Sequence, residues 1–368
     1  MKVAIINCFD TYEVREKCIY NFFMERNDSV IVIKSDFLHH KKESISINKD
    51  NYIYLKTNPY KKNLSIERLM SHYRFSKDVF KLVEDKKIDL LYVLIPPNYL
   101  VKESISYVKA HSNTKLIFDI IDLWPETMPI NNFKNIFPFS YWKNIRDKYL
   151  NKADFVITEC DLYQQVIEKI VDKTKMETLY LYREPNMLEK TPNLDESSIH
   201  LCYLGSINNI IDISTIGEII HKISKVYPVI LKIIGDGEKK EELILVSQEN
   251  GAKIEDYGKI YDPKKKQEIF NTCHYGLNIY KDTTFIGVTM KSIDYLDSGL
   301  PIINNIKGDT FSFVEKYNCG INYLRDVDEI IKCKKMIELR EQTQYVVNKF
   351  FSLENGKTLL EDIIRKVC

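Results

Sequence analysis

One stretch of the sequence combines small, basic and acidic residues at the spacing of a helix start. In residues 285–305, Gly287 and Thr289 precede an amphipathic run, and Lys291 falls in its first turn. The N-terminus of a helix carries unpaired N–H groups and positive partial charge that suit a phosphate, and the lysine adds a full charge. Asp294 follows on nearly the same helical face, where its carboxylate can accept hydrogen bonds from two vicinal hydroxyls. The pattern predicts a phosphate and sugar-hydroxyl site, and its alternative is an ordinary helix with a surface Lys–Asp pair.

A second acidic stretch, residues 118–127, follows a predicted strand. Asp122 is our first catalytic candidate, for contact with a sugar or with an acceptor hydroxyl, and Glu126 is the second. A carboxylate at the carboxyl end of a parallel strand faces the edge where ligands of such sheets bind. The alternative is structural: Asp122 caps a helix while Trp124 packs into the core.

Two loops that end strands on the same side supply polar and aromatic side chains. We expect Asp10 and Arg15 at the rim of a cleft, and Asn98 and Tyr99 in the wall that receives an acceptor. Tyrosine stacking and asparagine hydrogen bonds suit a sugar. His72 belongs to a basic helix face for which a solvated surface is the simpler interpretation.

Short apolar runs alternate with amphipathic runs along almost the whole chain, which predicts parallel sheets covered by helices on both faces. A polar, proline-containing stretch at 183–198 separates two such series and is the predicted linker. The strands expected before it are 3–7, 29–34, 52–55, 90–95, 116–120 and 155–158, and the helices are 13–24, 66–83, 100–110, 141–150 and 162–171. The strands expected after it are 199–204, 229–234, 254–256, 275–279, 301–304 and 320–324, and the helices are 213–224, 238–246, 263–270 and 290–297.

The predicted fold class is therefore α/β, with two Rossmann-like doubly wound domains facing a cleft. We expect a first domain at 1–185, a second domain at 199–345, and a helix at 346–368 that returns to the first domain.

Composition excludes several other classes of protein. A formal net charge of +1 over 368 residues gives no overall basic field for nucleic acid. The eight cysteines include no C-x-x-C pair, which is typical of reduced thiols in a cytosolic protein. No apolar stretch approaches the roughly 18 residues of a membrane span, and no signal peptide precedes the first strand. The sequence also lacks the G-x-G-x-x-G and P-loop motifs, which disfavours dinucleotide and P-loop chemistry.

The stretch around Asp294 resembles the nucleotide-sugar signature of GT-B glycosyltransferases, above all the large retaining family 4. The likeness rests on K-x-x-[acid]-Y-L-x-x-G-x-P, in which Asp294 stands where the family has a ribose-binding glutamate. The first glutamate of that signature would fall on Ile286, so this half of it is missing. The string D-L-W-P-E from Asp122 to Glu126 is similar to a subset of capsule and O-antigen glycosyltransferases, although Ile121 replaces a histidine that many relatives have.

Three more segments resemble the same family in the same order. Residues 203–209 resemble its diphosphate-binding glycine loop, residues 231–243 its central strand, turn and helix, and residues 257–270 the segment beside the nucleobase. The donor-binding residues that this resemblance implies are Gly205, Ser206, Gly235, Gly258, Lys259, Ile260, Gly287, Val288, Thr289, Lys291 and Asp294.

The resemblance implies transfer of a sugar from a nucleoside diphosphate sugar, with UDP-sugar as the expected donor, to a hydroxyl of a glycan or lipid-linked glycan. It also implies that residues 1–185 form the acceptor-binding domain and residues 199–345 the nucleotide-sugar-binding domain. It further implies a retaining hexosyltransferase of bacterial cell-surface polysaccharide synthesis. Because the sequence has no D-x-D segment, we expect no obligatory metal or other cofactor. We also expect a cytoplasmic protein with peripheral contact to the inner membrane. The alternative is a catalytically degenerate GT-B subunit that binds nucleotide or supports a partner transferase.

Overall fold

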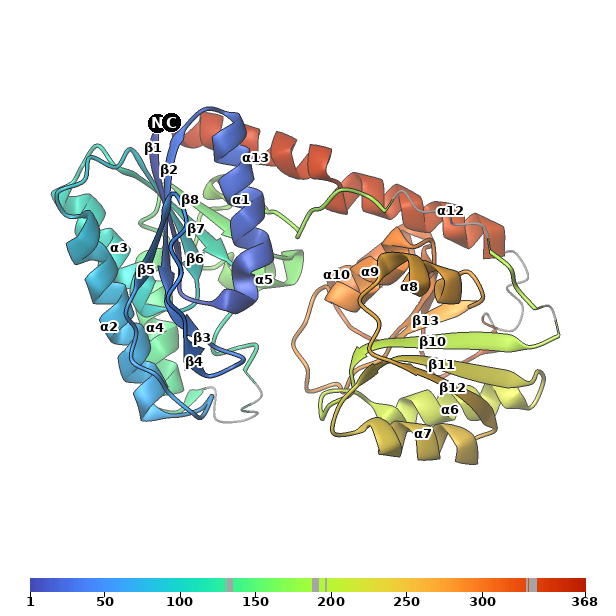
Figure 1. Cartoon of the computed structure of the whole chain (residues 1–368). Helices are drawn as coiled ribbons and strands as arrows, with labels where there is room; N and C mark the ends of the chain where they lie inside the picture. Colours follow the sequence, from blue (N-terminus) through green and yellow to red (C-terminus); the bar gives the residue numbers. More distant parts are fainter. Residues whose placement is uncertain (129, 131–134, 187–191, 196, 329, 331–335) are drawn as a thin grey trace. The chain divides into compact units, whose positions relative to one another are not determined.

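The chain folds into two compact units, each built on its own parallel sheet (Figure 1). The computed structural model describes residues 1–368 except 129, 131–134, 187–191, 196, 329 and 331–335. Unit 1 comprises Met1–Tyr182 with Gly356–Cys368, and unit 2 comprises Arg183–Asn355. Of the predicted linker, residues 187–191 and 196 lie outside the described residues. The two sheets confirm the predicted fold class of two Rossmann-like domains.

Unit 1 contains a seven-stranded sheet in the order β5-β2-β1-β6-β7-β8-β9, with every neighbouring pair parallel. All of these strands therefore end at the same edge of the sheet. Its strands are β1 (Lys2–Asn7), β2 (Ser29–Ser35), β5 (Tyr52–Leu55), β6 (Leu90–Ile95), β7 (Lys115–Ile120), β8 (Phe155–Thr158) and β9 (Met176–Thr178), with a separate hairpin of β3 (Phe37–Leu38) and β4 (Glu43–Ser44).

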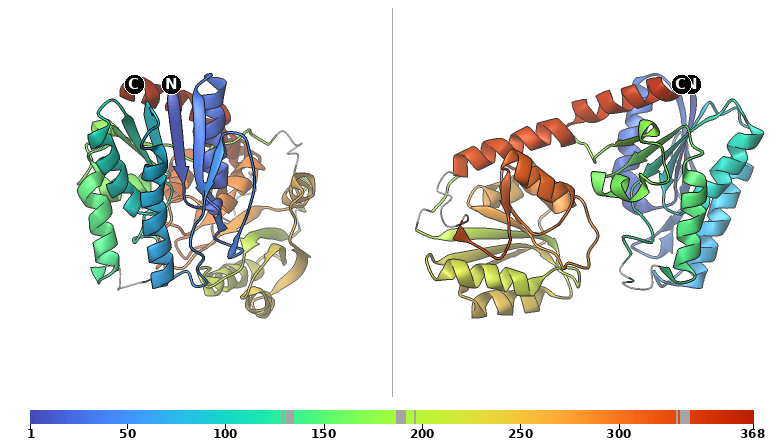
Figure 2. Two further views of the ribbon diagram at one scale, coloured as in Figure 1. Left: turned by 60° about the vertical axis from the view of Figure 1, so that its left-hand side comes forward. Right: turned by 180° about the vertical axis from the view of Figure 1, so that it is seen from behind.

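Helices cover both faces of this sheet (Figures 1 and 2). The central strand β6 reads LLYVLI and is buried along its whole length, as expected for a parallel strand packed on two sides. The helices are α1 (Glu13–Glu25), α2 (Ile66–Val83), α3 (Tyr99–Ala110), α4 (Phe139–Leu150) and α5 (Asp161–Ile167). The final helix, α13 (Leu353–Val367), begins in unit 2 and belongs to unit 1 from Gly356 onward.

Unit 2 contains a six-stranded parallel sheet in the order β12-β11-β10-β13-β14-β15. Its strands are β10 (Ile199–Ser206), β11 (Val229–Asp236), β12 (Ala252–Gly258), β13 (Tyr275–Asn278), β14 (Ile302–Asn304) and β15 (Gly320–Asn322). Its helices are α6 (Ile213–Ser224), α7 (Lys240–Glu249), α8 (Pro263–Phe270), α9 (Met290–Asp297), α10 (Asp309–Tyr317) and α12 (Met336–Val346), which continues into a π-helical turn at Val347–Phe351.

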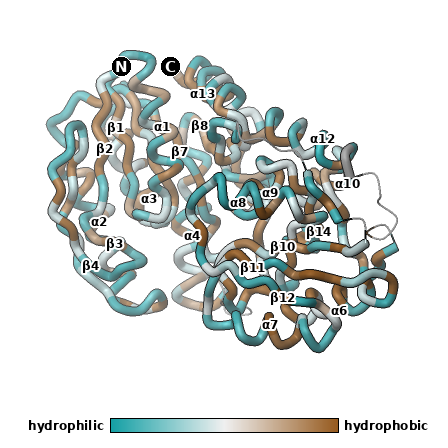
Figure 3. Tube along the Cα trace, turned by 45° about the vertical axis from the view of Figure 1, so that its right-hand side comes forward, coloured by the Kyte–Doolittle hydropathy of each residue, from teal (hydrophilic) through white to brown (hydrophobic). Residues whose placement is uncertain are grey.

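Local sequence explains why these helices begin where they do. The Asp212 side chain caps α6 by accepting a 3.1 Å hydrogen bond from Thr215 N, and four-residue spacing then buries an isoleucine stripe along the helix. Asp262 caps α8 in the same way, and Pro263 fits the first helical position. Hydrophobic residues gather along the strands, with polar residues on the outer turns (Figure 3).

Some elements differ from the sequence-based expectation. α10, β9 and the β3–β4 hairpin were not predicted. The strands β3, β4 and β9 have two or three residues each, which is too few to show a period. β10 and β11 each extend two residues beyond their predicted ends, to Ser206 and Asp236. The extension follows from pairing between the two strands, in which Ser206 lies opposite Asp236.

Candidate functional site

In unit 2, the start of α9 is fixed by a network of small polar side chains at the carboxyl edge of the sheet. Thr289 caps the helix: its hydroxyl accepts from Ser292 N at 3.1 Å, and the Ser292 hydroxyl accepts in return from Thr289 N at 3.2 Å. The Thr289 hydroxyl also donates to Asn278 Oδ1 at 2.9 Å. From Asn278 a ladder of side-chain amides crosses the sheet, through Asn304 at 2.8 Å to Asn322 at 2.9 Å. The helix start is thereby tied to the ends of three adjacent strands.

Lys291, the second residue of α9, is buried beneath two tyrosine rings. Its side chain is 7% exposed, and Nζ lies 4.3 Å from the centre of the Tyr203 ring and 4.4 Å from that of Tyr280. Nζ has no hydrogen-bond partner among the described residues. Burial lowers the pKa of Lys291 to about 7, because removal from water disfavours the charged form. An anion at this point would supply the missing partner.

Asp294 does not pair with Lys291 in the structure, so the surface Lys–Asp pair of the alternative interpretation is not formed. Its Oδ1 accepts a 2.7 Å hydrogen bond from Arg183 NH1, and Lys266 Nζ lies 3.8 Å from Oδ2. Arg183 NH2 also lies 3.4 Å from Asp297 Oδ2. The carboxylate predicted to hold a ribose is thus occupied by a guanidinium from the first residue of the unit.

The glycines near the carboxyl ends of β10 and β11 lie opposite each other and touch. Gly205 adopts a φ of +106°, and a Cβ on Gly235 would lie only 2.0 Å from Gly205 O, so no side chain fits there. Ser206, next to Gly205, is exposed. These two turns lie at the same sheet edge as the start of α9, because the strands are parallel neighbours through β13.

The remaining predicted donor residues flank this edge. Gly258 has a φ of +63°, and the exposed Lys259 pairs with Asp236 at 3.2 Å, while Ile260 is partly exposed. Gly287 is buried, its carbonyl accepting from the Thr310 backbone at 3.0 Å and from the Thr310 hydroxyl at 2.7 Å, and Val288 is partly exposed.

In unit 1, Asp122 lies in a turn after β7 and does not cap a helix among the described residues. Its carboxylate accepts a 2.6 Å hydrogen bond from Trp124 Nε1 and a short one from the Thr127 hydroxyl. Burial raises the pKa of Asp122, and these two hydrogen bonds and the charge of Arg68 oppose that rise. Trp124 itself is buried, as the structural interpretation expected.

Glu126, the second catalytic candidate, is engaged by Arg146. NH1 and NH2 of this 1%-exposed arginine donate to the two carboxylate oxygens at 2.8 and 3.0 Å. Burial raises the pKa of Glu126, but the hydrogen bonds and charge of Arg146 outweigh it, so the pKa lies below its ordinary value. The arrangement is that of a structural ion pair.

Arg15 does not lie at a rim, and this part of the sequence-based expectation is wrong. Its side chain is 3% exposed, and Nε and NH2 donate to the two oxygens of Asp119 at 2.8 and 3.0 Å. Tyr92 donates to the same Asp119 carboxylate at 2.6 Å. A buried guanidinium needs this carboxylate, so the pair joins α1 to β7 within the core of unit 1.

The other three predicted acceptor residues have mixed placements. Asp10 is partly exposed and accepts from His39 N at 2.8 Å. Asn98 is buried, and its amide donates to Trp124 O at 3.0 Å and to Trp142 O at 3.1 Å, so it is turned into the protein and not outward as a wall residue. Tyr99 is partly exposed.

Sequence reasoning missed Glu159, which directly follows β8. Burial raises its pKa to about 8; the charge of Arg15 opposes this rise, and those of Asp122 and Asp119 add to it. A carboxylic acid that stays protonated near neutral pH is a candidate proton donor. Its position immediately after a predicted strand was a signal that would have identified it.

His72 was expected on a solvated basic helix face, and Arg68 on the same helix was not singled out from the sequence. Both side chains are buried on α2, and His72 stacks on Trp124 with ring centres 6.1 Å apart. Both ring nitrogens of His72 lack a hydrogen-bond partner among the described residues, and burial lowers its pKa. In the described part of the chain, no three His, Cys, Asp or Glu residues are placed to hold a metal, and no helix is long and apolar enough to cross a bilayer.

The sequence matches no protein-family model and no curated protein. Its fold, however, is similar over the full length to that of several solved structures. Sucrose-phosphate synthase from Thermosynechococcus elongatus superposes with a TM-score of 0.73 at 12% identity, covering 100% of this chain and 98% of that one. HepE from Anabaena, in complex with UDP and glucose, has a TM-score of 0.67 at 11% identity, covering 100% of both chains. The lipopolysaccharide outer core galactosyltransferase WaaB has a TM-score of 0.68 at 13% identity, covering 99% of both chains. These likenesses, with two Rossmann-like sheets in one chain, establish the GT-B fold.

Proposed function

We propose that this protein is a glycosyltransferase that moves a sugar from UDP-sugar to a hydroxyl of a glycan or lipid-linked glycan. The observation that carries the proposal is Lys291 Nζ at the capped start of α9, which has no hydrogen-bond partner in the part of the chain that the structure describes. The similarity of the whole chain to three sugar-processing structures, one of which contains UDP, supports it.

The proposed chemistry centres on the departing diphosphate. As the bond to the sugar breaks, negative charge develops on the leaving oxygen, and preorganised donors stabilise it. Lys291, the N–H groups at the start of α9 and the amides of Gly205 and Ser206 take this role in our proposal. Lys291 meets the diphosphate as an ammonium, so binding above pH 7 requires uptake of a proton.

The rest of the donor is assigned to the flanking loops. Asp294 binds the ribose hydroxyls once Arg183 has released it, and the loop of Gly258, Lys259 and Ile260 lies beside the base. Asp122 contacts the sugar or the acceptor hydroxyl. The proposed transfer retains the anomeric configuration and needs no obligatory metal. It serves cell-surface polysaccharide synthesis at the cytoplasmic face of the membrane.

Nucleotide binding tests the central claim. In calorimetry, UDP should bind the wild type, and Lys291→Met should weaken that binding at least about tenfold, since a charged hydrogen bond contributes about 1.5–3 kcal/mol. Lys225→Met is the matched control. This lysine is exposed at the C-terminal end of α6, and the variant should bind UDP like the wild type. Equal UDP binding by wild type and Lys291→Met would remove Lys291 from the phosphate site.

Turnover tests the reaction itself. Release of UDP from UDP-sugars, followed with and without candidate acceptors, should exceed that from GDP- and dTDP-sugars. The anomeric configuration of the product, assigned by NMR, should match that of the donor, and inversion would contradict the retaining mechanism.

A second candidate, a degenerate subunit that binds nucleotide and supports a partner transferase, is favoured by one observation. The three carboxylates proposed for ligand contact all have protein partners: Asp122 with Trp124, Glu126 with Arg146, and Asp294 with Arg183. UDP binding without any UDP release from any tested donor would favour this candidate over the enzyme.

A further inference from the structure

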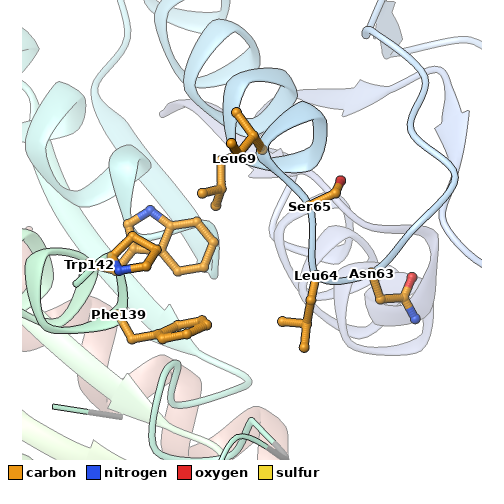
Figure 4. A pocket seen from close by; sticks show the side chains of 8 residues that line it. Asn63, Leu64, Ser65, Leu69, Phe139 and Trp142 are labelled. Carbon is orange, nitrogen blue, oxygen red and sulfur yellow. The ribbon is translucent and has the colours of Figure 1, made fainter. Parts of the chain in front are cut away.

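An apolar pocket opens in unit 1 between the starts of α2 and α4 (Figure 4). It has a volume of about 210 Å³. Phe139 and Trp142 of α4 line one side. Leu64, which precedes α2, and Leu69, which belongs to α2, line the other. Asn63 and Ser65 contribute polar side chains to its lining, and Trp142 contributes its indole N–H group. A cavity of this composition suits a hydrocarbon group.

The mouth of this pocket is surrounded by exposed apolar side chains. Leu64 is 54% exposed, Ile66 75% and Phe137 77%, which are large fractions for residues of this kind. Scattered exposed hydrophobic residues are normal, but these cluster at two adjoining helix starts around one pocket. The exposed Lys61 and Lys62 precede them in the chain. Such a surface suits an amphiphile or a lipid head-group region.

Behind the pocket lie two cations that have no carboxylate partner among the described residues. Arg68 is 6% exposed; its NH1 donates to Asn63 O at 2.7 Å, and its Nε has no partner. Lys42 Nζ donates to Asn63 Oδ1 at 2.6 Å and lies 4.7 Å from the centre of the Tyr60 ring. Asn63 therefore offers each cation only a neutral oxygen. The charge of Arg68 acts on Asp122 and that of Asp10 acts on Lys42, but neither cation forms an ion pair with a carboxylate among the described residues. Buried arginines are usually in such pairs, so this cluster has room for an anion.

The pocket and the cations share two walls. Asn63 and Ser65 line the pocket. Asn63 O also accepts from the guanidinium of Arg68, and Ser65 Oγ accepts from the backbone N–H of Arg68 as the cap of α2. On the other side, Trp142 lines the pocket and stacks on Trp124 with ring centres 6.2 Å apart, while the Arg68 guanidinium carbon lies 4.5 Å from the Trp124 ring. The apolar pocket therefore adjoins the cations Lys42 and Arg68.

We propose that this part of unit 1 binds a phosphate carried on a hydrocarbon chain. The chain occupies the pocket between Leu64, Leu69 and Trp142, and the phosphate replaces the neutral oxygens of Asn63 at Lys42 and Arg68. Two sources share this chemistry: the lipid carrier of an acceptor glycan, and a phospholipid of the membrane. Assigning the ligand to the acceptor rests on the proposed transferase function, whereas the binding itself does not.

The two tryptophans of the chain make a direct test possible. The sequence has two tryptophans: Trp142 lines the pocket and Trp124 stacks on it, so intrinsic fluorescence reports on this part of unit 1. We would titrate the wild type with farnesyl phosphate, farnesol and inorganic phosphate. Farnesyl phosphate should give a saturable change and bind at least about tenfold tighter than farnesol, because a charged hydrogen bond contributes about 1.5–3 kcal/mol. Inorganic phosphate at the same concentrations should give no change.

Variants distinguish the contribution of the two cations to lipid binding from that of the apolar pocket. Lys42→Gln and Arg68→Gln should bring farnesyl phosphate binding down to that of farnesol, and Leu64→Ser should weaken both lipids. Two matched controls should bind both lipids like the wild type. Lys77→Gln changes an exposed lysine of α2, the helix that carries Arg68, and Leu245→Ser changes a 56%-exposed leucine of unit 2. If Arg68→Gln fails to fold, judged by circular dichroism, the partly exposed Lys42 still decides.

The proposal is overturned if farnesyl phosphate binds no tighter than farnesol and phosphatidylglycerol vesicles give no response. It is also overturned if Lys42→Gln leaves binding of the phosphate-bearing lipid unchanged. Binding of monomeric farnesyl phosphate supports it and assigns the ligand to a single lipid carrier. A fluorescence change seen only with phosphatidylglycerol vesicles, absent with phosphatidylcholine, and lost in Lys42→Gln supports it and assigns the ligand to the membrane surface. UDP calorimetry in parallel reports on unit 2, so failure of the lipid site is distinguished from failure of the proposed transferase.

Discussion

Arg183 holds Asp294 through a 2.7 Å hydrogen bond across 111 residues of sequence. Arg183 is also the first residue of unit 2, and its backbone N–H donates to Phe351 O at 2.9 Å, next to the point where the chain leaves the unit again. The carboxylate proposed for the donor ribose is therefore bound by the segment through which the chain enters unit 2.

Removal of this arginine should strengthen nucleotide binding. Arg183→Ala frees Asp294 from a partly exposed ion pair, which contributes about 0.5–1 kcal/mol, so UDP should bind about two- to fivefold tighter. Isothermal titration calorimetry measures the change, with Lys266→Ala as a comparison at the weaker 3.8 Å contact. Weaker UDP binding by Arg183→Ala would instead mean that the guanidinium itself contacts the diphosphate.

Lys291 should make stability depend on pH. Its pKa is about 7 in the folded protein against 10.5 ordinarily, so between these values the unfolded chain binds a proton that the folded protein lacks. The free energy of unfolding should therefore rise with pH across this window, by up to about 1.4 kcal/mol per unit relative to Lys291→Met. Urea denaturation of both proteins at pH 7, 8 and 9 measures the difference. Parallel curves would mean that the lysine is not desolvated.

Glu159 should produce the opposite slope. Its pKa is about 8 against 4.5 ordinarily, so the folded protein keeps a proton between these values that the unfolded chain has lost. Relative to Glu159→Gln, the wild type should lose stability as pH rises from about 4.5 to 8, by at most about 1.4 kcal/mol per unit. Because Glu159 is partly exposed to water, we expect the free energy of unfolding to change less steeply with pH than this limit. A pH-independent difference between the two proteins would place the carboxyl in water.

Glu126 should prove structural. Glu126→Gln removes the charge opposite a 1%-exposed arginine and should lower the free energy of unfolding by about 1–3 kcal/mol. The exposed pair of Glu168 and Lys173 offers a control, since Glu168→Gln should cost less than about 0.5 kcal/mol. Chemical denaturation measures both. If turnover by Glu126→Gln falls although its stability matches the wild type, the catalytic assignment of Glu126 regains support.

Long periodic elements could be predicted from sequence, whereas contacts between distant segments could not. The helices at 66–83, 213–224, 263–270 and 290–297 match their predicted bounds because their caps and apolar stripes are local signals. The pairing of Arg15 with Asp119 joins residues 104 apart, so no spacing rule reveals it, and Arg15 was placed at a rim. Lys291 was correctly expected in the first turn of its helix. Its burial under Tyr203 and Tyr280 depends on where β10 and β13 end in space.

The return of α13 to unit 1 has a consequence for how the protein is made. Leu360, Ile363 and Ile364 of this helix are buried in unit 1, yet they are synthesised after the whole of unit 2. Unit 2 is one continuous stretch and can complete its core as it emerges from the ribosome, whereas unit 1, although it emerges first, must wait for its last helix. The first domain to be synthesised is therefore the last to be finished. A fragment ending at Tyr182 would leave the surface that receives this helix open to solvent.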